Sequence, residues 1–358
     1  MVETWRVIDT GLRTAAQNIA LDRALLEARQ AEEITSTLRF YRYMPAVLLG
    51  SQDSLAHEAE LDFCSTADIA VQRRITGGDA VYSDSAQLGW ALYLHQRDVR
   101  TADMRAIARR ICHAVSTALD ALNVNARYRA PDHIATSGRR LCAGGGVFEG
   151  DALLYQGLLY FDLDVATVLR ALRTPAQGLP NHALDAARGR MADLKMICGQ
   201  AAAFAFVKDL LIAALESEFG VEFQEADLSL TEHARYQHAL AEIDTPGWAD
   251  LMHRPASDVV TASASHQHPG GMLHASVLYD QARRRIKQVW FTGTTSSPPT
   301  ATLLAFEAHL NDTAVDRLER NTSTFFREHA VPAPASTPAD FIAVLRRALQ
   351  LPLIVTGS

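Results

Sequence analysis

Two segments of this sequence each place a pair of arginines close to a group of glycines. The first, RRITGGDA, holds Arg73 and Arg74 ahead of Gly77 and Gly78. Glycine has no Cβ, so a ligand can approach its backbone N–H closely, and a guanidinium offers two parallel donors to a phosphate or carboxylate. This combination predicts a loop that binds an anionic ligand. The residues leave one alternative open, a tight hairpin with solvent-facing arginines, because Gly-Gly-Asp suits a hairpin turn.

The second segment, SGRRLCAGGG, holds Arg139 and Arg140 ahead of three glycines. If both segments are strands of one sheet that end in glycine turns, their arginines can converge on one polyanion. The alternative is a second simple hairpin. Asp132 precedes this strand and suits either a metal ion bound to a nucleotide or, since it follows Pro131, a turn.

Other residues capable of chemistry have less support from their surroundings. His266 and His268 would share one face of a strand, as a metal site requires, with His274 nearby. No carboxylate or cysteine follows to complete such a site, so a Pro-Gly-Gly bend in a hairpin is favoured. The four cysteines are scattered without a CxxC motif. Cys142, between leucine and alanine, is interpreted as a small buried apolar residue.

Composition limits the class of protein. A chain of 358 residues with 48% hydrophobic residues favours two domains, and a net charge of −7 argues against general nucleic-acid binding. The charged N-terminal segment MVETWRVIDTG is not typical of a signal peptide. The longest apolar stretch, AAAFAFVKDLLIAAL, is interrupted by Lys208 and Asp209, which indicates a core helix and not a membrane span. We expect a cytoplasmic protein with neither nucleic-acid nor membrane partners.

The elements that must position these residues alternate unevenly along the chain. TWRVID, TLRFYRY, PAVLLGSQ, IAVQRRI and LGWALYLH have strand patterns, and the helical periodicity of AAQNIALDRALLEARQAEE and MRAIARRICHAVSTALDAL is clear. The stretch 133–164 indicates consecutive strands with GGG at the bend. This order predicts an α+β fold with a largely antiparallel sheet. A strand–strand–helix–helix order follows a change in composition near Pro255, so we predict domains of residues 1–254 and 255–358.

Taken together, these segments resemble the lipoate–protein ligase A family, which shares its catalytic fold with biotin ligases. The segments that carry the resemblance are AAQNIALDRALL with Asn18 and Asp22, PAVLLGSQ, RRITGGDAVYSD, PDHIATSGRRLCAG, YQGLLYFDLD, RMADL, and the C-terminal part from HPGGMLHASVLYD onward. The resemblance implies a class II synthetase/biotin-ligase-like mixed sheet flanked by helices. It also implies a small α+β accessory domain at the C-terminus.

The same resemblance implies a site and a reaction. Lipoate would attack the α-phosphate of ATP to give lipoyl-AMP, and a lysine of a lipoyl-acceptor domain would then take the acyl group. Arg74 and Arg140 would be the catalytic residues, and Asp132 would hold Mg²⁺ through ATP. The substrate and adenylate would be bound by Arg73, Gly77, Gly78, Asp79, Ala80, Tyr82, Gln156 and Gly157.

Several site positions depart from the family pattern. Asp79 replaces the third glycine of the loop, Ser83 the usual histidine, and Gln87 the usual asparagine. Arg140 replaces the lysine that contacts both the acyl carbonyl and the α-phosphate, and Gln156 replaces a histidine. Arginine keeps the charge but is planar and directed differently. An ATP-dependent lipoate or related acyl ligase is therefore the leading expectation. A noncatalytic acyl- or nucleotide-binding protein and a cysteine-dependent acyltransferase are the alternatives.

Overall fold

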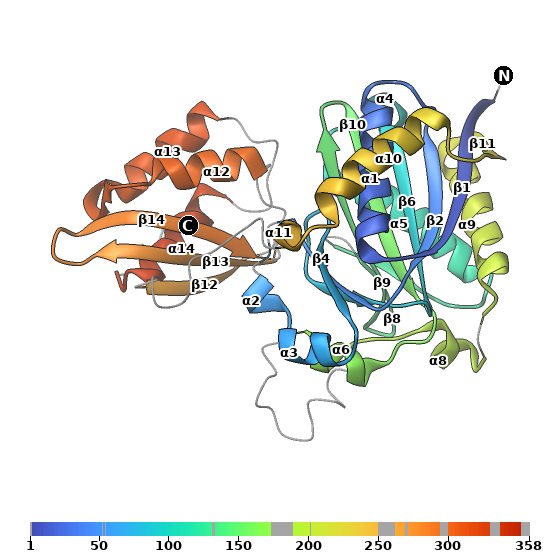
Figure 1. Cartoon of the computed structure of the whole chain (residues 1–358), viewed down its shortest axis with the longest axis horizontal. Coiled ribbons are helices and arrows are strands. Elements are labelled where there is room, and N and C mark those ends of the chain that lie inside the picture. Colours follow the sequence, from blue (N-terminus) through green and yellow to red (C-terminus); the bar gives the residue numbers. More distant parts are fainter. Residues whose placement is uncertain are drawn as a thin grey trace. The chain divides into compact units, whose positions relative to one another are not determined.

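The computed structural model describes most of the chain in separate stretches. They are residues 2–51, 53, 55–130, 133–172, 189–200, 202–249, 262–268, 271–293, 300–329 and 337–351. Within these stretches the chain folds into two compact units (Figure 1). The first unit holds the elements from β1 to α11. The second holds the elements from β12 to α14 together with the loop segments Gly50–Leu55 and Gly77–Asp79.

The first unit is built on an eight-stranded sheet with the order β11-β1-β2-β6-β10-β9-β8-β7, and a three-stranded sheet with the order β4-β3-β5 lies beside it. The strands are β1 (Glu3–Arg13), β2 (Thr37–Tyr43), β3 (Ala46–Leu49), β4 (Ala70–Arg73), β5 (Val81–Ser83), β6 (Gln87–His95), β7 (Arg127–Arg129), β8 (His133–Thr136), β9 (Arg139–Glu149), β10 (Ala152–Tyr160) and β11 (Val221–Glu225). The helices are α1 (Ala15–Gln30), α2 (Leu55–Glu58), α3 (Leu61–Thr66), α4 (Gln96–Val99), α5 (Met104–Asp120), α6 (Val165–Ala171), α8 (Leu194–Cys198), α9 (Phe204–Phe219), α10 (Leu230–Ile243) and α11 (Pro246–Ala249).

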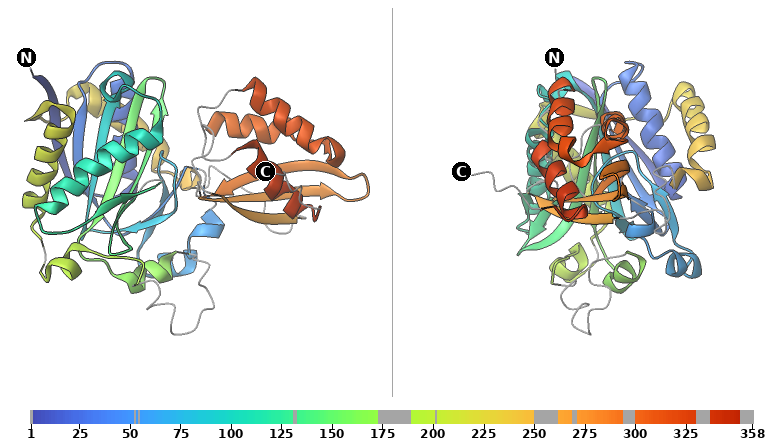
Figure 2. Two further views of the ribbon diagram at one scale, coloured as in Figure 1. Left: turned by 180° about the vertical axis from the view of Figure 1, so that it is seen from behind. Right: turned by 90° about the vertical axis from the view of Figure 1, so that its left-hand side faces the viewer.

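The large sheet is covered on both faces. Helix α1 lies against one face, with α10 packed against α1, and α5 and α9 lie on the other face, as the two opposite views show (Figures 1 and 2). Strand side chains alternate between these faces. Even-numbered residues of β6, such as Trp90, enter the core with α5 and α9, and odd-numbered ones, such as Tyr93, enter the core with α1. We call the second surface the α1 face.

The sheet is mixed, as the family resemblance implied, and it is largely antiparallel, as the strand order predicted. Strands β1–β2 and β1–β11 are parallel, and the other pairs of the eight-stranded sheet are antiparallel. The parallel pair β1–β2 arises where a long helix, α1, intervenes between the two strands, because such a crossover returns the chain in its original direction. Local signals set this helix: Thr14 and Gln17 form a capping box at the start of α1.

Two predicted hairpin features are wrong in their detail. Strands β4 and β5 both pair with β3 and not with each other, so the loop after Arg74 is a connection past β3 and not a tight hairpin. The glycines Gly144–Gly146 lie inside β9 and not at a bend, and the turn before this strand is at Ser137–Gly138. Both residues of that turn have positive φ, which suits a two-residue hairpin loop.

The second unit has its own core. Its strands are β12 (Ala262–His268), β13 (Gly271–Asp280), β14 (Arg285–Gly293) and β15 (Thr313–Ala314), and its helices are α12 (Thr300–His309), η1 (Val315–Arg317), α13 (Leu318–Glu328) and α14 (Pro338–Ala348). Phe291, Phe306 and Phe341 pack against one another where the helices meet the sheet. The boundary predicted at residue 255 lies outside the described residues and stays a prediction.

No helix in the described stretches is both long and apolar enough to cross a lipid bilayer.

We expect acid to weaken the attachment of α10 to the sheet through Glu232. This carboxylate, buried at the start of α10, pairs with Arg6 of β1. Burial raises the pKa of Glu232, but hydrogen bonds from Arg6 and from the Ser229 backbone outweigh it and hold the pKa below 4.5. A depressed pKa contributes stability above 4.5 that is lost as the pH falls through the folded-state value. In the Glu232→Gln variant, the free energy of unfolding measured in urea should therefore fall less steeply with decreasing pH below about pH 5. If the unfolding free energy of the variant fell with pH as steeply as that of the wild type, Glu232 would not be the group responsible.

Candidate functional site

Glycine and alanine make up most of two neighbouring rows of residues on the α1 face of the large sheet. The pairings of β10 with β6 and β9 place Gly89, Leu158 and Ala143 in one row across the strands. They place Ala91, Gln156 and Gly145 in the next row on the same face. Because paired residues share a face, all six lie on the α1 face. The Tyr41 ring covers Gly89, where an added Cβ would lie 2.4 Å from it, whereas Ala143 and Gly145 of β9 are only half-buried. Gln156 is the polar group between them.

The segment Arg74–Thr76 lies next to these rows. Nε2 of Gln156 donates a hydrogen bond of 2.8 Å to Oγ of Thr76, which directly precedes the two glycines. Arg74 is buried at the end of β4, and its guanidinium donates to the Leu48 carbonyl at 2.6 Å. Its backbone N–H donates to the Leu49 carbonyl at 3.0 Å. The structure therefore brings Arg74, Thr76 and Gln156 into one region, and the arginines do not face solvent.

The loop glycines are required by a close approach of backbones. A Cβ on Gly50 would lie 2.1 Å from the carbonyl oxygen of Gly78, and Gly78 has a φ of +92°. The buried carboxylate of Asp53 accepts a hydrogen bond from the Gly50 N–H at 2.8 Å. Gly50, at the end of the segment that begins with PAVLL, thus meets the Arg-Arg loop at Gly78, although the two lie far apart in the sequence.

A β-bulge directs Arg140 toward the α1 face. The pairing of β8 with β9 shifts between Ile134 and Ala135, so that Leu141 and Cys142 both enter the core beneath α5. After the shift Arg140 pairs with Ala135, on the face that also carries Ala143. Arg139, its neighbour, lies on the opposite face, where its guanidinium contacts Sδ of Met196 at 3.2 Å.

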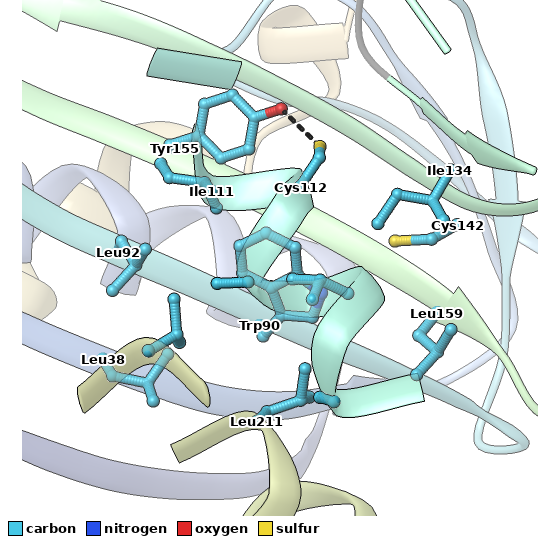
Figure 3. Packing of buried hydrophobic residues seen from close by; sticks show 14 of the residues in the cluster. Leu38, Trp90, Leu92, Ile111, Cys112, Ile134, Cys142, Tyr155, Leu159 and Leu211 are labelled. Carbon is cyan, nitrogen blue, oxygen red and sulfur yellow. Dashed lines mark hydrogen bonds between the residues drawn. The ribbon is translucent and has the colours of Figure 1, made fainter. Parts of the chain in front are cut away.

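Cys142 faces away from the loop, into the apolar core. Figure 3 shows Cys142 beside Ile134, in the cluster that contains Trp90 and Tyr155. Burial raises the pKa of the Cys142 thiol well above its ordinary range. The prediction of a small buried residue is confirmed. A thiol with a raised pKa is a poor nucleophile, because the thiolate is the reactive form.

A buried ionic network lies under α1, next to the small-residue rows. Arg39 of β2 is 0% exposed and donates to Asp22 at 2.7 Å and to the Asn18 side chain. Tyr93 donates to the same Asp22 oxygen. The Arg39 guanidinium stacks 4.3 Å from the centre of the Tyr41 ring, and a Cβ on Gly89 would collide with that ring. The network thus packs against the small-residue rows.

Several predicted site residues lie elsewhere or have packing roles. Arg73 donates to the Ala249 carbonyl at 2.8 Å and accepts from the Trp248 indole at 2.9 Å through its own carbonyl, which attaches α11 to β4. Tyr82 is buried on the side of β5 opposite Val81, and Val81 is the residue that packs toward α1. Gly157 lies under Trp90, where a Cβ would be 2.2 Å from the indole ring.

The remaining predicted residues lie on the Arg-Arg loop, outside the described residues, or in the second unit. Gly77, Gly78 and Asp79 lie on the loop, half-buried, with Ala80 after them. Asp132, the predicted magnesium ligand, lies outside the described residues. His266 pairs with Asp340 at 3.1 Å, and Nδ1 of His274 contacts Oγ of Ser265 at 2.6 Å. Within the described stretches no group of three or more His, Cys, Asp or Glu side chains is arranged to hold a metal ion.

The fold is that of lipoate ligase structures. P. falciparum LipL1 in complex with lipoate aligns with a TM-score of 0.71 at 13% identity, over 96% of this chain and 98% of that one. A lipoate-protein ligase A bound with ATP aligns with a TM-score of 0.60 at 21% identity, over 70% of this chain and 98% of that one. The predicted α+β class, with a mixed sheet flanked by helices, is confirmed.

The family follows from the sequence match. The model of the lipoyl protein ligase A/B catalytic domain matches residues 14–216, which is more than half of the chain, so the chain belongs to this family. The octanoyltransferase LipM of Moorella thermoacetica is 23% identical over 69% of this chain and 97% of its own length. Lipoate-protein ligase A subunit 1 of Thermoplasma acidophilum is 24% identical over 61% of this chain and 84% of its own. The predicted family resemblance is confirmed, and both activities occur among its relatives.

Proposed function

We propose that this chain is an ATP-dependent ligase that attaches lipoate, or a related medium-chain acyl group, to a lysine of a lipoyl-acceptor domain. The observation that carries the proposal is the division of residues between the two sides of β9. Arg140 and Gly145 share the α1 face with Gln156, whereas Cys142 enters the core. Strand β9 therefore presents a guanidinium, and not a thiol, to the face that carries Gln156.

The chemistry of a ligase fits this arrangement. The acyl chain lies over the small residues, and its carboxylate meets the loop after Arg74. An oxygen of that carboxylate attacks the α-phosphorus of ATP, and pyrophosphate leaves. Arg140 stabilises the negative charge of the acyl-adenylate that forms. The lysine amine of the acceptor then attacks the acyl carbonyl, and AMP leaves. Asp132 is the proposed ligand of the Mg²⁺ that accompanies ATP.

The octanoyltransferase relatives make a cysteine-dependent transferase the second candidate. Cys64, Cys112 and Cys142 are buried, and burial raises the pKa of Cys64 and Cys142. Cys198 is exposed, at the end of α8. It is therefore the cysteine on which a transferase reading has to be tested.

The test compares two reactions of the purified protein. ATP–pyrophosphate exchange is measured with lipoate and with octanoate, and octanoyl transfer from an octanoylated carrier protein to a lipoyl domain is measured without ATP. A ligase shows exchange that persists in the Cys198→Ser variant. Transfer without ATP that is lost in Cys198→Ser would assign the transferase instead. Binding of an acyl-adenylate analogue without either reaction would favour a noncatalytic binding protein.

A further inference from the structure

A short segment beyond β10 holds the backbone of Arg140. The Arg140 N–H donates to the Arg190 carbonyl at 2.8 Å, and the Ala192 N–H donates to the Arg140 carbonyl at 2.9 Å. Arg140 and Met191 thereby form a parallel bridge. We call residues 190–193 the strap.

The strap continues the sheet where β10 stops. Strand β10 accompanies β9 only as far as the pair of Leu159 with Cys142. On its other side, Arg140 pairs with Ala135 of β8. The backbone of Arg140 is thus held between β8 and the strap. A shift of the strap must move Arg140, because two backbone hydrogen bonds join them directly.

Asp193 fixes the strap to the end of β10. It is 6% exposed, and it caps α8, accepting from the Met196 N–H at 2.7 Å through Oδ1. Its other oxygen, Oδ2, lies 3.5 Å from the Leu163 N–H, which donates to it. A second anchor is the Lys195 N–H, which donates to the Phe161 carbonyl at 2.9 Å. One carboxylate therefore bridges the start of α8 and the chain that leaves β10.

We propose that Asp193 is a positioning residue for Arg140, acting through the strap. The inference rests on the proposed function, since it gives Arg140 a role at the ligand. Asp193 itself caps α8 and contacts Leu163, so it acts only by placing the strand that carries the guanidinium. Misplacement of a charged group by about 1 Å can cost on the order of 10²-fold in rate. The position of the strap is therefore a determinant of adenylation.

The experiment uses three substitutions in the full chain. Asp193→Ala removes the cap, whereas Asp193→Asn keeps an oxygen that can accept from Met196 N–H. Asp164→Ala is the matched control, because Asp164 caps α6 in the same way from the same exit of β10. We expect Asp193→Ala to lower kcat for ATP–pyrophosphate exchange about tenfold to a hundredfold. We expect Asp193→Asn to stay within about threefold of wild type, and Asp164→Ala to match wild type.

A binding cycle separates positioning from general damage. The dissociation constant of a lipoyl-sulfamoyladenosine, a stable acyl-adenylate analogue, is measured for wild type, Asp193→Ala, Arg140→Ala and the double variant. Positioning through Arg140 predicts that Asp193→Ala weakens binding in wild type but adds nothing once Arg140 is alanine. Full additivity, or equal losses in Asp193→Ala and Asp164→Ala, would overturn the inference. Failure of the wild type both to bind the analogue and to catalyse exchange would instead reject the proposed function.

Discussion

Replacing Arg140 with lysine is expected to raise ATP–pyrophosphate exchange with lipoate by about tenfold to a hundredfold. A lysine ammonium is compact and can bridge an acyl oxygen and a phosphate oxygen, whereas a guanidinium favours two parallel contacts with one phosphate. Loss of one well-placed donor costs on the order of 10²–10³ in rate. A lysine that restores the contact with the acyl oxygen should therefore recover much of this loss in rate. Binding of an acyl-adenylate analogue should change far less, because both side chains are cationic.

The control for this substitution is the preceding residue. Arg139→Lys makes the same chemical change on the opposite face of β9, against Met196, and should leave exchange unaltered. Melting temperatures establish that both variants are folded. A wild type that already exchanges quickly and an Arg140→Lys variant that is slower would mean that the site is optimised around arginine.

Arg39→Met is expected to lower the free energy of unfolding by about 3–5 kcal/mol. The substitution leaves Asp22 at 0% exposure without its cationic partner. Burial already raises the pKa of Asp22, and its Oδ2 atom has no hydrogen-bond partner among the described residues. An unpaired charge at such a position costs far more than the pair contributes. Urea unfolding monitored by circular dichroism measures the change.

A surface pair provides the comparison. Arg97 pairs with Glu32 at 3.1 Å where both are exposed, so Arg97→Met should leave the urea midpoint unchanged. Combining Arg39→Met with Asp22→Leu should recover part of the lost stability, because a buried pair can be replaced by apolar residues. If Arg39→Met proved no more damaging than Arg97→Met, the buried network would not stabilise this part of the fold.

Local patterns in the sequence were sufficient for the class of fold and for most of the elements. The periodicity that predicted α1 and α5 is read within the helix itself. The Arg-Arg loop was found because glycines and arginines have narrow physical uses. The burial of Cys142 followed from its apolar neighbours.

Tertiary structure alone decided which of these residues meet. Whether the loop after Arg74 is a hairpin depends on β3 entering between β4 and β5, and no local pattern encodes that pairing. The bulge at Leu141, which decides that Arg140 and not Arg139 lies on the α1 face, depends on a register shift against β8, because a one-residue slip reverses the face of every side chain beyond it. The contacts of Arg39 and Asp193 were not predicted for the same reason. Their partners lie on other elements, and long-range contacts leave little trace in the spacing of residues along the chain.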